Sequence, residues 1–126
     1  MNSTDPSSNP VPLIDSDQLE SACGGDAVLK RELMDMYFGQ ADQIMPGLHQ
    51  AIQTGAVADV NHLAHKLAGA SLACGLSAIV PSLRRMEHGA RAGHLEGAEA
   101  SMAKAVKSLE LLRQAVQDHL GQLQSP

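Results

Sequence analysis

Residues 61–75 have the sequence N-H-L-A-H-K-L-A-G-A-S-L-A-C-G, and this stretch decides how the chain folds. Leu, Ala and Lys favour helices, and the apolar residues recur at helical spacing, so we expect one amphipathic helix here. Counting about 100° per residue from Val60 gives a buried stripe within about 60° of that residue. The stripe contains Leu63, Ala64, Leu67, Ser71 and Cys74.

His65 falls on the open face of this expected helix, about 140° from Val60. Its neighbours there, at spacings of three, four and seven residues, are Ala68, Gly69 and Leu72. Gly69 costs roughly 1 kcal/mol relative to alanine inside a helix, and close approach of a partner would offset that cost. The pattern therefore indicates a histidine that another protein can reach.

Composition excludes several classes of protein. The chain has 126 residues, which suits one domain, and its 44% hydrophobic but only 2% aromatic residues indicate a core of Leu, Ala, Ile, Val and Met. A net charge of −5 argues against a nucleic-acid partner. The sequence contains no apolar signal core and no stretch able to span a bilayer, so we expect no membrane association and a cytoplasmic protein with reduced cysteines.

The pattern predicts a tail, a short helix and four longer helices. Residues 1–12 are rich in Ser, Asn and Pro and are expected to be a flexible tail, with residues 13–123 forming the domain. A short helix follows Asp15 or Ser16 and ends at Gly24-Gly25. Amphipathic helices are then expected at about 27–54, 57–74, 76–92 and 95–120.

Prolines and short connections refine this arrangement. Pro46 should kink or divide the first long helix, whose apolar stripe includes Leu29 and either Met36 or Tyr37, and Pro81 should kink the third or mark its start. Short connections make successive helices antiparallel neighbours. We therefore expect an all-α, up-down-up-down four-helix bundle with a short extra N-terminal helix.

In this context residues 65–75 resemble the core motif of histidine-containing phosphotransfer (HPt) domains. The family pattern is H-x-L-K-G with a second glycine six residues beyond the first, and it is matched by His65, Leu67, Gly69 and Gly75. The run G-D-x-x-L-x-x-E-L at 25–33, the sequence M-P-G-L at 45–48 and the run at 83–93 are also similar to family members, so the resemblance covers about residues 16–120. One position departs from the pattern, because the family's lysine is Ala68 here, and Arg84, Arg85 or Arg91 could supply the missing positive charge instead.

The resemblance implies a two-component phosphorelay protein that accepts a phosphoryl group from a receiver-domain aspartate and passes it to another receiver. His65 would be the phosphoacceptor, since neutral imidazole, with a pKa of about 6.5, is a good nucleophile near pH 7. Support for the phosphate or the active site is assigned to Lys66, Gly69, Glu87 and Arg91, and receiver docking to Ala68 and Leu72.

The same resemblance implies response-regulator receiver domains and a hybrid sensor kinase as partners of a monomeric protein. It implies no cofactor of its own, with Mg²⁺ on the partner receiver. The sequence has no glycine-rich phosphate loop and no nucleotide motif, so we expect no autonomous ATP-dependent kinase activity. We expect a stand-alone protein, and the alternative that the chain is a fragment of a hybrid kinase stays open.

Three other functions are conceivable for these residues. A non-catalytic HPt-like interaction module would keep the fold and the docking surface but transfer slowly or not at all, because of Ala68. His62 and His65 could form a metal pair, but bundle metal sites use inward Glu-x-x-His sets that this chain lacks, so no metal is expected. A nucleophilic pair of Cys74 and His65 is opposed by their separation of about 180° around the helix.

Overall fold

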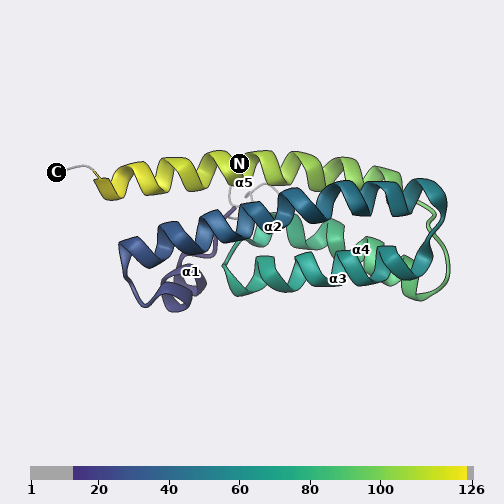
Figure 1. Cartoon of the computed structure of the whole chain (residues 1–126), viewed down its shortest axis with the longest axis horizontal. Coiled ribbons are helices and arrows are strands. Elements are labelled where there is room, and N and C mark those ends of the chain that lie inside the picture. Colours follow the sequence, from purple (N-terminus) through teal and green to yellow (C-terminus); the bar gives the residue numbers. More distant parts are fainter. Residues whose placement is uncertain (1–12, 125–126) are drawn as a thin grey trace, which may run out of the picture.

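The computed structural model describes residues 13–124 (Figure 1), and the expected tail at 1–12 lies outside the described residues. The described chain is all-helical, as predicted, and contains no strand between residues 13 and 124. Its elements are α1 (Ser16–Cys23), α2 (Ala27–Thr54), α3 (Val57–Ala73), the short 3-10 helix η2 (Ser77–Ile79), α4 (Val80–Arg91) and α5 (Ala98–Gln124).

Short polar side chains and glycines set the ends of the first helices where the sequence predicted them. Asp15 caps α1 by accepting a hydrogen bond from the Gln18 amide, and Asp26 caps α2 by accepting from the amides of Val28 and Leu29. Gly24 and Gly55 follow α1 and α2 in the left-handed conformation, with φ of 60° and 73°.

The two prolines act differently. Pro46 lies inside α2, which continues to Thr54 without dividing. Both Pro46 and Asp42, whose carbonyl loses its helical partner, are exposed, so water can satisfy that carbonyl. Pro81 is the second residue of α4 and marks its start, where a missing amide is harmless.

The last helix begins later than predicted. It starts at Ala98 rather than near Leu95, because Gly97 adopts a φ of 77° in the preceding connection. Leu95 nevertheless packs against the core from this connection.

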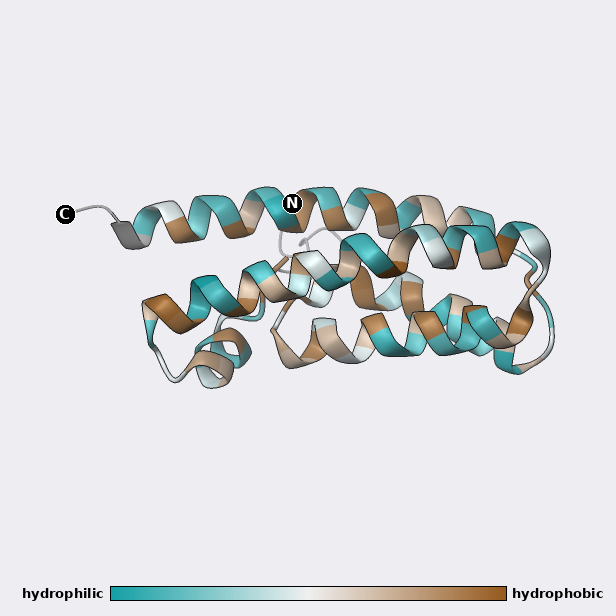
Figure 2. Ribbon diagram, in the orientation of Figure 1, coloured by the Kyte–Doolittle hydropathy of each residue, from teal (hydrophilic) through white to brown (hydrophobic). Residues whose placement is uncertain are grey.

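One hydrophobic core holds the long helices together. Helix α2 packs against α3 and α5, and α4 also packs against α3 and α5. Apolar and hydrophilic residues alternate along each long helix (Figure 2), as expected for helices with one buried face. The fully buried side chains include Leu48, Val60, Leu67, Leu83 and Leu112. Each such leucine contributes roughly 1.5–3 kcal/mol through burial.

The first turns of α2 pack differently from the prediction. They extend beyond α3 and α4, beside α1 and the end of α5 (Figure 1). Leu29 is exposed, which corrects its expected place in the stripe, and of the two alternatives Met36 and Tyr37 only Tyr37 is buried. Lys30 is buried instead, ion-paired with Glu20 of α1.

Helix α1 is anchored to the end of α3 through Gly75. The Asp15 amide donates a hydrogen bond to the Gly75 carbonyl at 2.6 Å, and Gly75 has a φ of 76°. A Cβ atom on Gly75 would lie 2.5 Å from the Asp15 carbonyl oxygen and 2.9 Å from the Leu19 amide nitrogen. Backbone would therefore have to move, and glycine is required here by packing as well as by conformation.

None of the helices within residues 13–124 is long and apolar enough to cross a bilayer.

We predict that Gly75→Ala lowers the free energy of unfolding by more than about 2 kcal/mol, measured by urea denaturation, because strain and backbone overlap act together. Gly55→Ala is the matched control, since Gly55 also has a positive φ but a Cβ there would meet nothing within 4 Å in the described chain. That control should lose only about 1–2 kcal/mol. Equal losses in the two variants would contradict a packing role for Gly75.

Candidate functional site

His65 lies on α3 and reaches across to α4. Its side chain is 66% exposed, and its Nδ1 atom lies 2.6 Å from Oε2 of Glu87 on α4. The Glu87 side chain is only 2% exposed. Glu87 thus lies at the histidine, as the sequence predicted. Its buried carboxylate hydrogen-bonds to one nitrogen of an exposed imidazole.

Two arginines of α4 complete the arrangement. Arg84 Nη1 donates to Oε1 of Glu87 at 2.6 Å, and Arg91 Nη2 donates to Oε2 at 2.8 Å. They stand three residues before and four residues after Glu87, which places all three side chains on one face of the helix. We call His65, Arg84, Glu87 and Arg91 the Glu87 cluster.

These contacts keep Glu87 ionised. Burial by itself would raise the pKa of the Glu87 carboxyl, but the hydrogen bonds from Arg84 and His65, the positive charge of Arg84 and that of His65 when its ring is protonated hold the pKa of Glu87 below its ordinary value. An ionised carboxylate can only accept hydrogen bonds, so the neutral imidazole of His65 carries its proton on Nδ1. The lone pair is then on Nε2. No donor among residues 13–124 hydrogen-bonds to this nitrogen, so the lone pair is available for nucleophilic attack.

The other predicted site residues differ in their placement. Gly69 is exposed, and a Cβ added to it would meet nothing within 4 Å in the described chain, so nothing inside the fold requires glycine there. Leu72 is exposed as well. Lys66 is exposed but takes no part in the ion pairs of the described residues, whereas Arg91 lies in the Glu87 cluster.

The prediction that Ala68 lies on the open docking face is wrong, because Ala68 is fully buried. Helix α3 packs against both α2 and α4. Its buried arc therefore reaches Ala68, about 80° from Val60, and is wider than the arc of about 60° assumed from the sequence. The position one turn after His65 thus carries neither a cation nor a docking contact.

Arg84 is the member of the cluster that the sequence named only as one of three alternatives, together with Arg85 and Arg91. The structure brings Arg84 and Arg91 to Glu87, whereas Arg85 is exposed and takes no part in the ion pairs of residues 13–124. The spacing of three residues between Arg84 and Glu87 is the signal that would have identified Arg84, once Glu87 was known to be buried.

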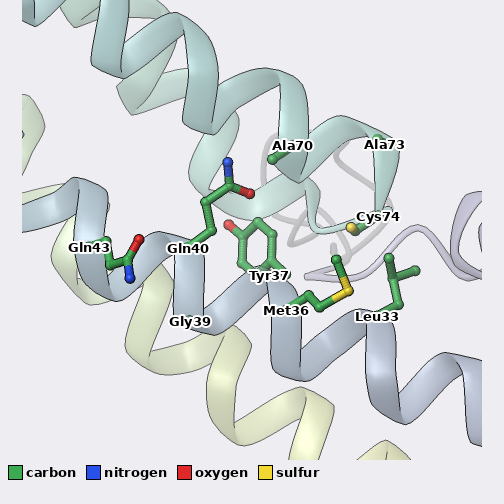
Figure 3. Close-up of a pocket in the computed structure, with 9 residues that line it drawn as sticks. All are labelled: Leu33, Met36, Tyr37, Gly39, Gln40, Gln43, Ala70, Ala73 and Cys74. Atoms are coloured by element: carbon green, nitrogen blue, oxygen red, sulfur yellow. The ribbon is translucent and has the colours of Figure 1, made fainter.

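A groove of about 630 Å³ runs between α2 and α3 (Figure 3). Its lining is mostly apolar and consists of Leu33, Met36, Tyr37, Gly39, Gln40, Gln43, Ala70, Ala73 and Cys74. Met36 is 71% exposed at this groove, although a methionine is normally core filler.

The floor of the groove is fixed by a buried hydrogen bond. Ser71 Oγ donates its proton to the Leu67 carbonyl oxygen at 2.7 Å. The Tyr37 hydroxyl lies 2.7 Å from Ser71 Oγ and must therefore donate its own proton to Ser71 Oγ. Burial raises the pKa of Tyr37 to about 12, so the hydroxyl keeps its proton. Cys74 is buried at the same groove, on the opposite side of α3 from His65, as the helical angles predicted.

Comparison with known proteins identifies the family. The sequence model of the Hpt domain matches residues 32–125. The chain belongs to the Hpt domain family. It is similar in fold to the crystal structure of histidine-containing phosphotransfer protein B from Pseudomonas aeruginosa PAO1, with a TM-score of 0.82, 22% sequence identity, and coverage of 90% of this chain and 98% of that chain. None of the curated proteins matches the chain.

Membership in the Hpt family confirms the resemblance seen in residues 65–75 and supports a histidine phosphotransfer function in a phosphorelay. Among residues 13–124, no three His, Cys, Asp or Glu side chains are grouped so that they could hold a metal ion.

The lowered pKa of Glu87 predicts a pH-dependent stability difference between the wild type and Glu87→Gln. The folded-state pKa lies below the unfolded value of about 4.3, so the carboxylate's contribution is fully present above that pH and is lost as the pH falls through the folded-state pKa. We expect the wild type to be more stable at pH 7 by about 1.5–3 kcal/mol, and the difference to narrow below about pH 4.

Urea denaturation at a series of pH values would measure this difference. Glu110→Gln is the control, because Glu110 is exposed in the middle of α5 and takes no part in the ion pairs of the described residues, and this variant should follow the wild type at every pH. A Glu87→Gln difference that is the same at pH 7 and pH 3 would contradict an ionised Glu87.

Proposed function

We propose that this Hpt domain accepts a phosphoryl group on Nε2 of His65 from a receiver-domain aspartate and passes it to a second receiver. The observation that carries this proposal is the hydrogen bond from Nδ1 of the exposed His65 to the buried Glu87 carboxylate. In the neutral form of the imidazole, this hydrogen bond directs the basic nitrogen Nε2 outward to the solvent. The four long helices, taken as alternating in direction, form the rigid support for this group.

The transfer step follows from this geometry. Nε2 attacks the phosphorus of the partner's aspartyl phosphate, the phosphorus–nitrogen bond forms, and the bond to the aspartate oxygen breaks with its electron pair left on the carboxylate. The proton on Nδ1 stays in place. Positive charge develops on the ring as the bond forms, and the adjacent Glu87 carboxylate stabilises it. Transfer to the second receiver is the reverse of these events.

The phosphoryl group needs positive charge, and Arg91 is well placed to supply it. The Arg91 side chain is 61% exposed and uses only Nη2 on Glu87, so its other nitrogens can meet a phosphoryl oxygen. His65 Nδ1 and Arg91 Nη2 bind the same carboxylate oxygen, which keeps the guanidinium beside the ring. A role for the exposed Lys66 stays a prediction. In this scheme Mg²⁺ comes from the receiver, and the domain uses neither a cofactor nor ATP of its own.

Docking would use the surface that continues from His65 over Gly69 and Leu72 to the groove between α2 and α3. Its centre is apolar and its edge is polar, which suits a short-lived contact with a receiver domain that buries less than roughly 1,200 Å². We place this exchange in the cytoplasm, between a hybrid sensor kinase and a response regulator, with the Hpt domain acting as a monomer.

A transfer assay from a panel of phosphorylated receiver domains tests the phosphoacceptor. We predict acid-labile, base-stable label on the wild type and on His62→Gln, and none on His65→Gln. His62 is the matched control because it is an exposed histidine one turn earlier on α3. His65→Gln should change the free energy of unfolding by less than about 1 kcal/mol, because the side chain is largely exposed. Label that persists on folded His65→Gln would refute the assignment.

The alternative function is an interaction module that binds receivers without efficient transfer, and the replacement of the family's lysine by Ala68 favours it. The same assay separates the two functions. Binding of receiver domains without label on the wild type would support the module. Label on the wild type at rates well above those of His65→Gln would exclude it.

Gly69 provides a test of the open surface. We predict that Gly69→Leu stays folded but transfers at least tenfold more slowly, because the added side chain covers the approach to His65, at a cost of about 1.4 kcal/mol for each factor of ten. Gly69→Ala is the control, expected to raise the free energy of unfolding by up to about 1 kcal/mol with a smaller effect on transfer. Transfer at the wild-type rate in Gly69→Leu would show that the partner does not approach over this face.

A further inference from the structure

We propose that Arg84 is a positioning residue for phosphotransfer, which holds the Glu87 carboxylate so that it can orient His65. The proposal rests on the proposed function of His65. It assigns to Arg84 an effect on the reaction that is exerted through Glu87, without contact between Arg84 and the histidine.

The two arginines divide the Glu87 carboxylate between them. Arg84 is bound to Oε1, whereas Oε2 is shared by His65 and Arg91. Arg84 is therefore the side chain that fixes the oxygen not used by the histidine. With both oxygens held, the carboxylate cannot rotate about its last bond without breaking a charge-assisted hydrogen bond. Oε2 thus stays 2.6 Å from Nδ1 of His65.

Of the two arginines, Arg84 also provides the larger part of the positive charge that compensates the Glu87 carboxylate. Its side chain is 33% exposed against 61% for Arg91, so water weakens its interaction with Glu87 less. A carboxyl group buried as deeply as that of Glu87 becomes neutral when it lacks such a partner. Without Arg84 the pKa of Glu87 would rise, because of the two groups that lower it only His65 would remain, and the hydrogen bond from Arg91 comes from a more solvated side chain.

The consequence appears at the imidazole. A protonated Glu87 can donate a hydrogen bond as well as accept one, so His65 would no longer be restricted to the form with its proton on Nδ1. Molecules with the proton on Nε2 have no lone pair on that exposed nitrogen, and their other ring nitrogen faces Glu87, so they cannot attack a phosphoryl group through Nε2. Arg84 also makes the sum of the charges of Arg84, Glu87 and Arg91 positive, which matters because buried Ala68 leaves no cation one turn after His65.

Within residues 13–124, the surroundings of Glu87 contain no other group that would take over this role. From α3 the carboxylate meets His65, and from its own helix it meets Arg84 and Arg91. Helix α5 and η2 also pack against α4, but between residues 13 and 124 neither offers a charged side chain that hydrogen-bonds to this carboxylate.

The test compares Arg84→Met and Arg84→Lys with Arg85→Met. Arg85 is the matched control, because it is the next residue on α4, is exposed, and its replacement removes the same charge. Circular dichroism establishes that each variant is folded. The readouts are the rate of phosphoryl transfer from a phosphorylated receiver as a function of pH, and the ¹⁵N shifts of the His65 ring, which report where its proton lies.

We expect Arg84→Met to transfer at least about tenfold more slowly at neutral pH. The acid side of its pH profile should move to higher pH, and the Nδ1-protonated form of His65 should become less populated. Arg84→Lys should recover part of the rate and of the ring shifts, and Arg85→Met should resemble the wild type. If Arg84→Met does not fold, Arg84→Lys and Arg84→Gln carry the test, with the glutamine variant expected to be the more impaired.

The proposal is overturned if the ring shifts and the pH profile of folded Arg84 variants match those of the wild type, whatever happens to the rate. It is also overturned if Arg85→Met loses as much activity as Arg84→Met. The ring shifts are measured on the isolated domain, so they test Arg84 even if no receiver phosphorylates the wild type. That last result would instead refute the proposed function.

Discussion

The structure depends on one buried negative charge, the carboxylate of Glu87. Placing a carboxylate in a protein interior costs several kcal/mol unless donors surround it, and here the donors come from two helices. Arg84 and Arg91 are supplied by the same helix, but His65 is supplied by α3. A slip of α3 along α4 by one residue would turn His65 away and leave part of the charge unpaired. The requirement to satisfy Glu87 therefore helps to fix the register of the two helices, and the same contact fixes the orientation of the histidine.

The far end of α3 is held by a different kind of contact. At Gly75 the backbone of α1 approaches so closely that no side chain fits between the two segments. Between these two points, the hydrogen bond from Tyr37 to Ser71 joins α2 to α3. Helix α3 is thus held in its middle from one side, at Ser71 from another, and at its end by α1. A side chain as exposed as that of His65 would normally sample several rotamers, but on a helix held in this way its ring keeps one orientation, which is what an efficient nucleophile requires.

The sequence revealed those features that depend on neighbouring residues. Asp15, Asp26 and Gly55 mark helix ends through contacts within a few residues, and their positions were predicted closely. The open position of His65 followed from helical periodicity. Ala68 was misplaced because the width of a buried arc depends on how many helices pack against it, which no single helix reveals. Arg84 could not be chosen over Arg85 from the sequence for a related reason. Its importance depends on the burial of Glu87, and burial is a property of the assembled bundle.

In the sequence alone, the absence of the family's lysine argues against phosphotransfer. The structure weakens that argument. A lysine one turn after the histidine would place positive charge near the phosphoryl group, but an ammonium group there could not select the position of the imidazole proton. The Glu87 cluster can do both, because its two arginines outweigh the carboxylate in charge while that carboxylate accepts the proton on Nδ1. Ala68 therefore removes one source of charge in a site that has another, and the buried acid makes the nucleophile depend on α4 rather than on α3 alone. The chemistry of His65 is then sensitive to the packing between two helices, so a partner that shifts α4 would change the reactivity of the histidine without touching it.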